Sequence, residues 1–138
     1  MLNGWIQLWE KLMPKVLMAP ISIGELLDKI SILEIKQFFA RKNPEKLANI
    51  ETELFSLREL YTITDPEVQS LYDELKNINK MLWHIEVYKR NCEQEKNFGV
   101  DFVNAARQVY IRNDERARIK REINRVTDSL IVEEKLYS

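Results

Sequence analysis

From Pro66 to the end of the chain, the only glycine or proline is Gly99. Asp65 and Pro66 are typical of the N-cap and the first residue of a helix, and Phe98-Gly99 is typical of a stop. The pattern therefore predicts a helix over about residues 66–97, about 48 Å long at 1.5 Å per residue. Asp101 is the predicted N-cap of a further helix over about residues 102–127. Two long helices joined around Gly99 are expected to form an antiparallel hairpin.

Two shorter helices are predicted before this hairpin. Ser22 and Glu25 form a capping box that opens a helix over about residues 22–41. Its apolar residues lie on more than one side, which is typical of a central helix. The next helix, over about residues 44–62, begins at Asn43-Pro44 and carries a single apolar stripe.

The composition agrees with an all-α fold. The chain has 138 residues, of which 45% are apolar and 31% are charged. Three glycines and four prolines supply little material for the turns of an all-β fold. We therefore predict an antiparallel bundle of four main helices with extended N- and C-terminal segments. Residues 1–14 form an N-terminal extension, and residues 15–138 form one helical-bundle domain.

Both ends of the chain leave alternatives open. Residues 2–13 place Trp5 and Trp9 at helical spacing, typical of an amphipathic helix at a membrane or against protein. The polar face has too few lysines for anionic lipid, which favours packing on protein or a loosely ordered extension. Residues 128–138, DSLIVEEKLYS, either return along the bundle or pair as a short strand with residues 16–19. No apolar run approaches the roughly 20 residues of a membrane span, so we expect a cytoplasmic protein.

Several function classes are disfavoured. A formal net charge of −1 argues against a dedicated nucleic-acid binder. Cys92 is the only cysteine, which excludes an internal disulfide and is typical of a small buried hydrophobe in a reducing compartment. His84 is the only histidine and lacks the Glu-x-x-His spacing of di-iron bundles. No phosphate-binding loop or nucleotide fingerprint is present, so we predict neither a metal nor a cofactor.

The helix over residues 102–127 carries polar residues where a core helix would repeat leucine. In the antiparallel hairpin, residues whose numbers sum to about 199 lie level, which places Glu86 beside Asn113 and one turn from Arg116. On the first helix, Asp28 and Glu34 fall on faces that should be covered, whereas Glu25 faces solvent. Buried polar groups need partners, so we predict that Glu34, Glu86 and Arg116 meet in one site. The full predicted cluster is Glu34, Glu86, Arg90, Asn113, Arg116 and Lys120.

Two functions fit such a cluster. It is either an ionic network inside an interaction or structural module, where such networks fix register more than they stabilise, or a cleft for a small anionic metabolite. In the cleft, arginine would bind carboxylate or phosphate with two hydrogen bonds, and a glutamate would orient the ligand or exchange protons. The first function is favoured, and no reaction is specified by the spacing.

Four segments resemble a family of short bacterial proteins catalogued only as a domain of unknown function. They are APISIGELLDKISILEIK, LWHIEVYKRNCE, and FVNAARQVYIRNDERARIKREIN with LIVEEKLY, within about residues 15–137. The resemblance implies no activity, and His84 stands where an acidic residue is commoner in the family. It implies these motif positions: Asp28, Lys29, Glu34, Lys36, Trp83, Glu86, Arg90, Phe102, Tyr110, Asn113, Asp114, Arg116, Lys120 and Asn124. By looser analogy, all-helical chorismate mutases hold a dicarboxylate between arginines, a lysine and a glutamate.

The long helix over residues 66–97 also bears on assembly. It outruns the two shorter helices by about 20 Å, so its region around Ile85, Val87 and Tyr88 needs a cover. The N-terminal segment, the C-terminal tail or a second copy would supply one, and we expect a homodimer.

Overall fold

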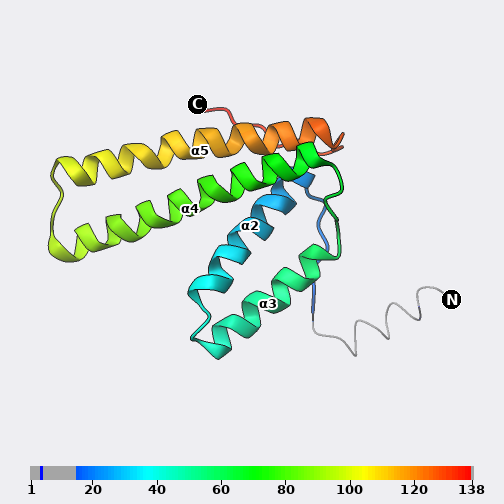
Figure 1. Ribbon diagram of the computed structural model, residues 1–138, viewed down its shortest axis with the longest axis horizontal. Helices are drawn as coiled ribbons and strands as arrows, with labels where there is room; N and C mark the ends of the chain where they lie inside the picture. Colours follow the sequence, from blue (N-terminus) through cyan, green and yellow to red (C-terminus); the bar gives the residue numbers. More distant parts are fainter. Residues whose placement is uncertain (1–3, 5–14, 138) are drawn as a thin grey trace.

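The computed structural model describes Gly4 and residues 15–137, which fold into four helices without a strand in that part of the chain (Figure 1). The helices are α2 (Ile23–Phe39), α3 (Pro44–Arg58), α4 (Pro66–Glu95) and α5 (Val100–Val126). The predicted all-α architecture with four main helices is confirmed. The predicted extension at residues 1–14 lies, except for Gly4, outside the described residues.

The helix starts follow the predicted caps, with one exception. The side chains of Ser22, Asn43 and Asp65 accept hydrogen bonds from backbone N–H groups in the first turns of α2, α3 and α4. Gly99, however, is the N-cap of α5, so the prediction of Asp101 as N-cap is wrong. Asp101 lies in the first turn instead, where a carboxylate is stabilised by the positive end of the helix dipole.

The four helices form two hairpins that diverge from a common end (Figure 1). The long helices α4 and α5 run side by side, and the shorter α2–α3 hairpin leaves them at an angle. Among the described helices, α2 packs against α3, α4 and α5, whereas the backbone of α3 lies next to α2 only. The central position expected for the first helix is therefore observed.

The core lies at the end where the hairpins meet. Its buried side chains are Leu26, Leu27, Ile30, Leu33, Leu54, Val68, Tyr72, Leu75, Ile78, Ile119 and Ile123. At the far end of α2, the Phe39 ring stacks on Trp83 with the ring centroids 4.9 Å apart. Past this contact, α4 and α5 project without α2 or α3 beside them (Figure 1). In the projecting part, the buried side chains are the small Cys92 and Ala105, so the buried position expected for Cys92 is confirmed.

The apolar contribution of α5 to the core is short. Ile119 and Ile123 are buried core residues, whereas Tyr110 is 56% exposed. The hairpin with α4 rotates α5 so that Ile119 and Ile123, four residues apart, point to the core.

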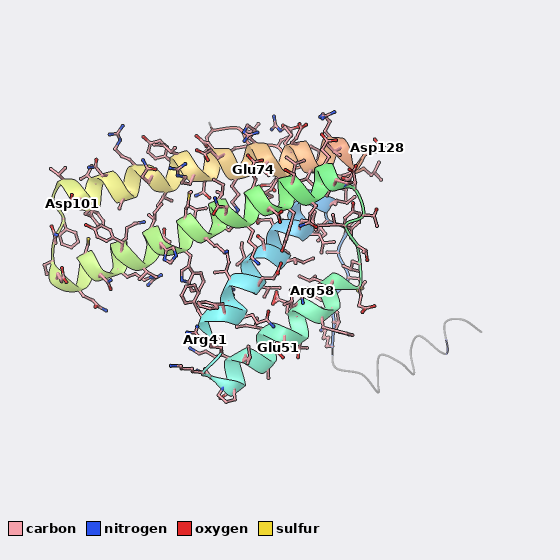
Figure 2. All side chains as sticks on the ribbon, in the orientation of Figure 1. Arg41, Glu51, Arg58, Glu74, Asp101 and Asp128 are labelled. Atoms are coloured by element: carbon pink, nitrogen blue, oxygen red, sulfur yellow. The ribbon has the colours of Figure 1, made fainter. Side chains whose placement is uncertain are left out.

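The C-terminal tail, residues 128–137, returns along α5 rather than pairing as a strand (Figure 1). Three ion pairs hold it there: Lys120 with Glu133, Arg121 with Glu134, and Lys135 with Asp114, at 3.0, 3.2 and 2.6 Å. Figure 2 labels Asp101 and Asp128 near the two ends of α5, and the tail begins at the Asp128 end. Among the helices described, none has the length and apolar character needed to cross a membrane.

Candidate functional site

A buried carboxylate, Asp28 on α2, is the centre of the polar cluster. It is 1% exposed, and the Arg116 guanidinium of α5 binds both of its oxygens. The Arg116 Nε donates to Asp28 Oδ1 at 2.8 Å, and a terminal nitrogen donates to Oδ2. This bidentate geometry is the strongest form of side-chain ion pair. The hydrogen bond to Asp28 raises the pKa of Arg116, and burial opposes that rise only in part.

Helix α4 completes the same cluster with an amide. The Asn79 Nδ2 donates to Asp28 Oδ1 at 2.9 Å and to Ser31 Oγ at 2.7 Å. The Ser31 hydroxyl in turn donates to the backbone carbonyl of Asp28. These bonds join the buried side chains of α2 and α4 to the half-buried Arg116 of α5, so the cluster specifies how the two hairpins meet.

Lys120 forms a second ionic contact one turn further along α5. Its Nζ donates to Glu25 Oε2 at 2.6 Å and to Glu133 Oε2 at 3.0 Å, and its side chain is 13% exposed. Burial acts to lower the pKa of Lys120, but the hydrogen bonds with Glu25 and Glu133 outweigh it, and the pKa is raised. The expectation that Glu25 faces solvent is therefore wrong: Glu25 points to α5.

The start of α2 is clamped by the end of α5. The Gly24 N–H donates to Asn124 Oδ1 at 2.7 Å, and the Ile23 N–H donates to Ser129 Oγ at 3.3 Å. The Glu25 N–H donates to Ser22 Oγ, so the first N–H groups of α2 all have partners. A Cβ atom at Gly24 would lie 2.5 Å from the Lys120 carbonyl oxygen, so only glycine permits this approach.

The predicted meeting of Glu34 with Glu86 and Arg116 is not observed. Glu34 pairs with Lys76 of α4 at 3.2 Å and with Arg58 of α3 at 3.4 Å. Glu34 follows Asp28 by six residues, which places the two carboxylates about 120° apart around α2. Asp28, not Glu34, is therefore the carboxylate that faces Arg116. Glu86 pairs with Lys89 in its own helix at 3.3 Å.

Two hollows border Arg116, and they divide the other predicted residues between them. The first, about 670 Å³, lies between α5 and the tail and is lined by Asn113, Arg116 and Lys120 together with the tail residues Glu133, Lys135 and Tyr137. The second, about 480 Å³, lies between α2 and α4. Its lining residues are Ile32, Asn79, Leu82, Trp83, Glu86, Val87, Arg90 and Arg116.

The two hollows differ in charge and polarity. In the first, Arg116, Lys120 and Lys135 each bind a carboxylate of the chain. In the second, the walls are mainly apolar, and Arg90 makes no ion pair with any other described residue. Within residues 15–137, no group of three histidine, cysteine or acidic side chains is arranged to hold a metal ion.

Four side chains of the observed polar contacts lie outside the predicted site: Glu25, Asp28, Asn124 and Glu133. For Asp28 a signal existed, because its covered position on the helical wheel demanded a cation. Asn124 also stood out as a polar residue on the inner face of α5. Glu133 gave no such signal, since the direction of the tail decides its partner.

Comparison with known proteins gives a family match. The model described as "Family of unknown function (DUF6165)" matches residues 17–138. The match agrees with the resemblance seen in the four sequence segments. No curated protein and no solved structure matches the chain.

Proposed function

The chain belongs to DUF6165, a family of unknown function, and we propose that it is an interaction module that docks a protein partner in the hollow between α2 and α4. In this proposal the ionic cluster around Asp28 is internal structure that sets the angle between the two hairpins. The projecting α4–α5 hairpin then presents the mainly apolar hollow. The single cysteine of the chain, Cys92, is buried and fits a reducing compartment. A cytoplasmic location is part of the proposal.

One observation carries this choice: the cations of the first hollow are already neutralised by the chain itself. Asp28 forms an ion pair with Arg116, Glu25 and Glu133 form ion pairs with Lys120, and Asp114 forms one with Lys135. An anionic metabolite entering there would have to displace one of these carboxylates. The apolar walls of the second hollow have no such internal partner, and exposed apolar concavities mark interaction sites.

The experiment compares anion binding in two forms of the full chain. The double variant Asp28→Asn/Arg116→Met removes both charges while leaving an amide oxygen for Asn79. Thermal unfolding is followed with inorganic phosphate, succinate or malate. Each anion is added up to about 10 mM, which exceeds ordinary KM values for metabolites. Wild type and double variant are expected to show the same, small shifts in Tm.

The opposite outcome would favour the anion-binding cleft. If one of these anions raises the Tm of the wild type by several degrees, and the folded double variant loses that shift, Arg116 binds ligand and the interaction proposal fails. The matched control is Arg118→Met, an arginine on the same helix with a side chain that is 64% exposed. It should leave every shift unchanged.

A further inference from the structure

One face of α4 passes from a covered to an uncovered environment. Asn79, Trp83, Glu86 and Arg90 are spaced by three and four residues, so they share this face. Asn79 is buried under α2 by its bonds to Asp28 and Ser31. Further along, Trp83, Glu86 and Arg90 line the 480 Å³ hollow. The face therefore continues beyond α2 with the same residue spacing but without a helix on it.

We propose that a second copy of this chain covers this face, with α4 packed antiparallel on the partner's α4 around a two-fold axis that crosses this face at the level of residue 88. The inference rests on the proposed function, because it names the partner that the α2–α4 hollow accepts. The proposed dimer has the two-fold symmetry that is common to most homodimers.

The charges on this face are complementary to themselves. A two-fold axis at residue 88 brings together residues whose numbers sum to 176, so Glu86 meets the partner's Arg90 and Arg90 meets the partner's Glu86. Within one chain, Glu86 has only Lys89 in its own helix at 3.3 Å, and Arg90 has no ion pair among the described residues. The antiparallel dimer would form this ion pair twice, so that each of the four charges has a partner.

The apolar side chains beside these charges give the interface its area. Phe39 is 48% exposed and Val87 is 46% exposed, and Trp83 lines the hollow itself. Aromatic residues are enriched at protein interfaces. A near-zero net charge of −1 does not oppose self-association.

The described parts of the chain do not fill the hollow themselves. The tail is held on α5 by its three ion pairs, and its residues line the first hollow, not the second. In Figure 1 the chain enters α2 past α3, on the other side of the α2–α3 hairpin from the projecting half of α4. A second copy is therefore the occupant that the charge pattern favours.

The test is charge reversal measured by sedimentation equilibrium of the full chain at low salt. The wild type should move from a 16.5 kDa species towards twice that mass as concentration rises. Glu86→Arg or Arg90→Glu alone should raise the dissociation constant at least about tenfold, because like charges then face each other twice. An equimolar mixture of the two variants, and the double variant Glu86→Arg/Arg90→Glu, should recover the wild-type value within about threefold.

Glu95→Arg is the matched control. Glu95 is exposed and follows Glu86 by nine residues, which places it on the opposite side of α4. The dimer dissociation constant of Glu95→Arg should equal that of the wild type. Circular dichroism should show the same helix content in every variant.

Three results would overturn the inference. The first is a wild type that does not exceed 16.5 kDa at any concentration, and the second is a pair of single variants that dimerise as well as the wild type. The third is occupation of the hollow by the N-terminal segment, detected when Trp5→Ser/Trp9→Ser quickens hydrogen exchange in residues 83–90 of a monomeric chain. The first two results leave the proposed function standing, whereas the third removes the docking hollow as well; anion binding that depends on Arg116 is the separate result that overturns the proposed function alone.

Discussion

At Asp28, the pairing with Arg116 is a structural requirement that can be measured. Arg116→Met would leave a carboxylate that is 1% exposed without its cation. Breaking a buried pair on one side costs about 3–5 kcal/mol; we expect about 3, since the Arg116 side chain is 29% exposed. Asp28→Asn/Arg116→Met should recover at least half of that loss in urea unfolding. A single Arg116→Met variant as stable as the wild type would contradict the structural role.

At Gly24, helix propensity and packing predict opposite signs. Replacing a helix-interior glycine by alanine normally stabilises by about 1 kcal/mol. Here the new Cβ would lie 2.5 Å from the Lys120 carbonyl oxygen and 2.9 Å from Asn124 Oδ1. Since backbone must move to admit it, Gly24→Ala should lower the free energy of unfolding by about 1–3 kcal/mol. In the control, Gly99→Ala, the Cβ meets only Asn97 Oδ1 at 3.6 Å, and thermal unfolding should change little.

The sequence identifies the polar residues that α5 contributes to the site, but not the residues with which they pair. Asn113, Arg116 and Lys120 stood out because they occupy the inner face of a helix that should repeat apolar residues. The choice between Asp28 and Glu34 as partner depends on how α2 is rotated against α5. Gly24 permits that rotation, because without a side chain it lets the start of α2 lie directly against Lys120 and bond to Asn124 of α5. Helical periodicity within one segment does not contain this information.

At the scale of elements, the helices themselves were predictable because their signals are local. Ser22, Asn43 and Asp65 cap their helices as expected, each with a polar side chain on a nearby N–H. The start of α5 was misplaced because Gly99 has no side chain to reveal its capping role. The tail was left between two alternatives, since its return along α5 depends on ion pairs between segments distant in sequence.

Docking of the tail should depend on pH at both extremes. The Lys120 hydrogen bond lowers the pKa of Glu133 below its ordinary 4.5, so this docking energy is present above pH 4.5 and lost as pH falls through the lowered value. The pKa of Lys120 is raised above 10.5, so its contribution is present below pH 10.5 and lost as pH rises through the raised value. Heteronuclear NMR relaxation should show residues 130–137 ordered between these limits.

Glu133→Gln tests the acidic limit of tail docking. It should leave the tail more mobile at neutral pH and remove most of the change at low pH. Glu51→Gln, on an exposed position of α3 labelled in Figure 2, is the control and should behave as the wild type. A wild-type tail that stays equally ordered at every pH from 7 down to the acid unfolding of the helices would contradict the role of Glu133.

For the whole molecule, the all-α fold followed from the sequence, but the divergence of the two hairpins did not. The apolar residues of α2 and α3 indicate which side of each helix is buried. They do not indicate the angle at which the helices cross. The buried set of α4 ends its continuous run at Asn79, which coincides with the point where α2 departs. The charged residues Glu86 and Arg90, on the face that continues from Asn79, thus mark the part of α4 that leaves the core.

This division of the hairpin predicts a gradient of local stability along α4 and α5. Residues 68–79 of α4 pack into the core, whereas residues 85–95 have Cys92 as their buried side chain. Segments with few buried apolar contacts open with lower free energy, so hydrogen exchange should be fastest towards residues 95–105 and slowest near residue 75. If the projecting half is covered by a second copy, protection of residues 83–90 should increase with protein concentration, and Glu86→Arg should abolish that increase. A uniform protection along both helices, unchanged by concentration, would show that the projecting half belongs to the same cooperative unit as the core.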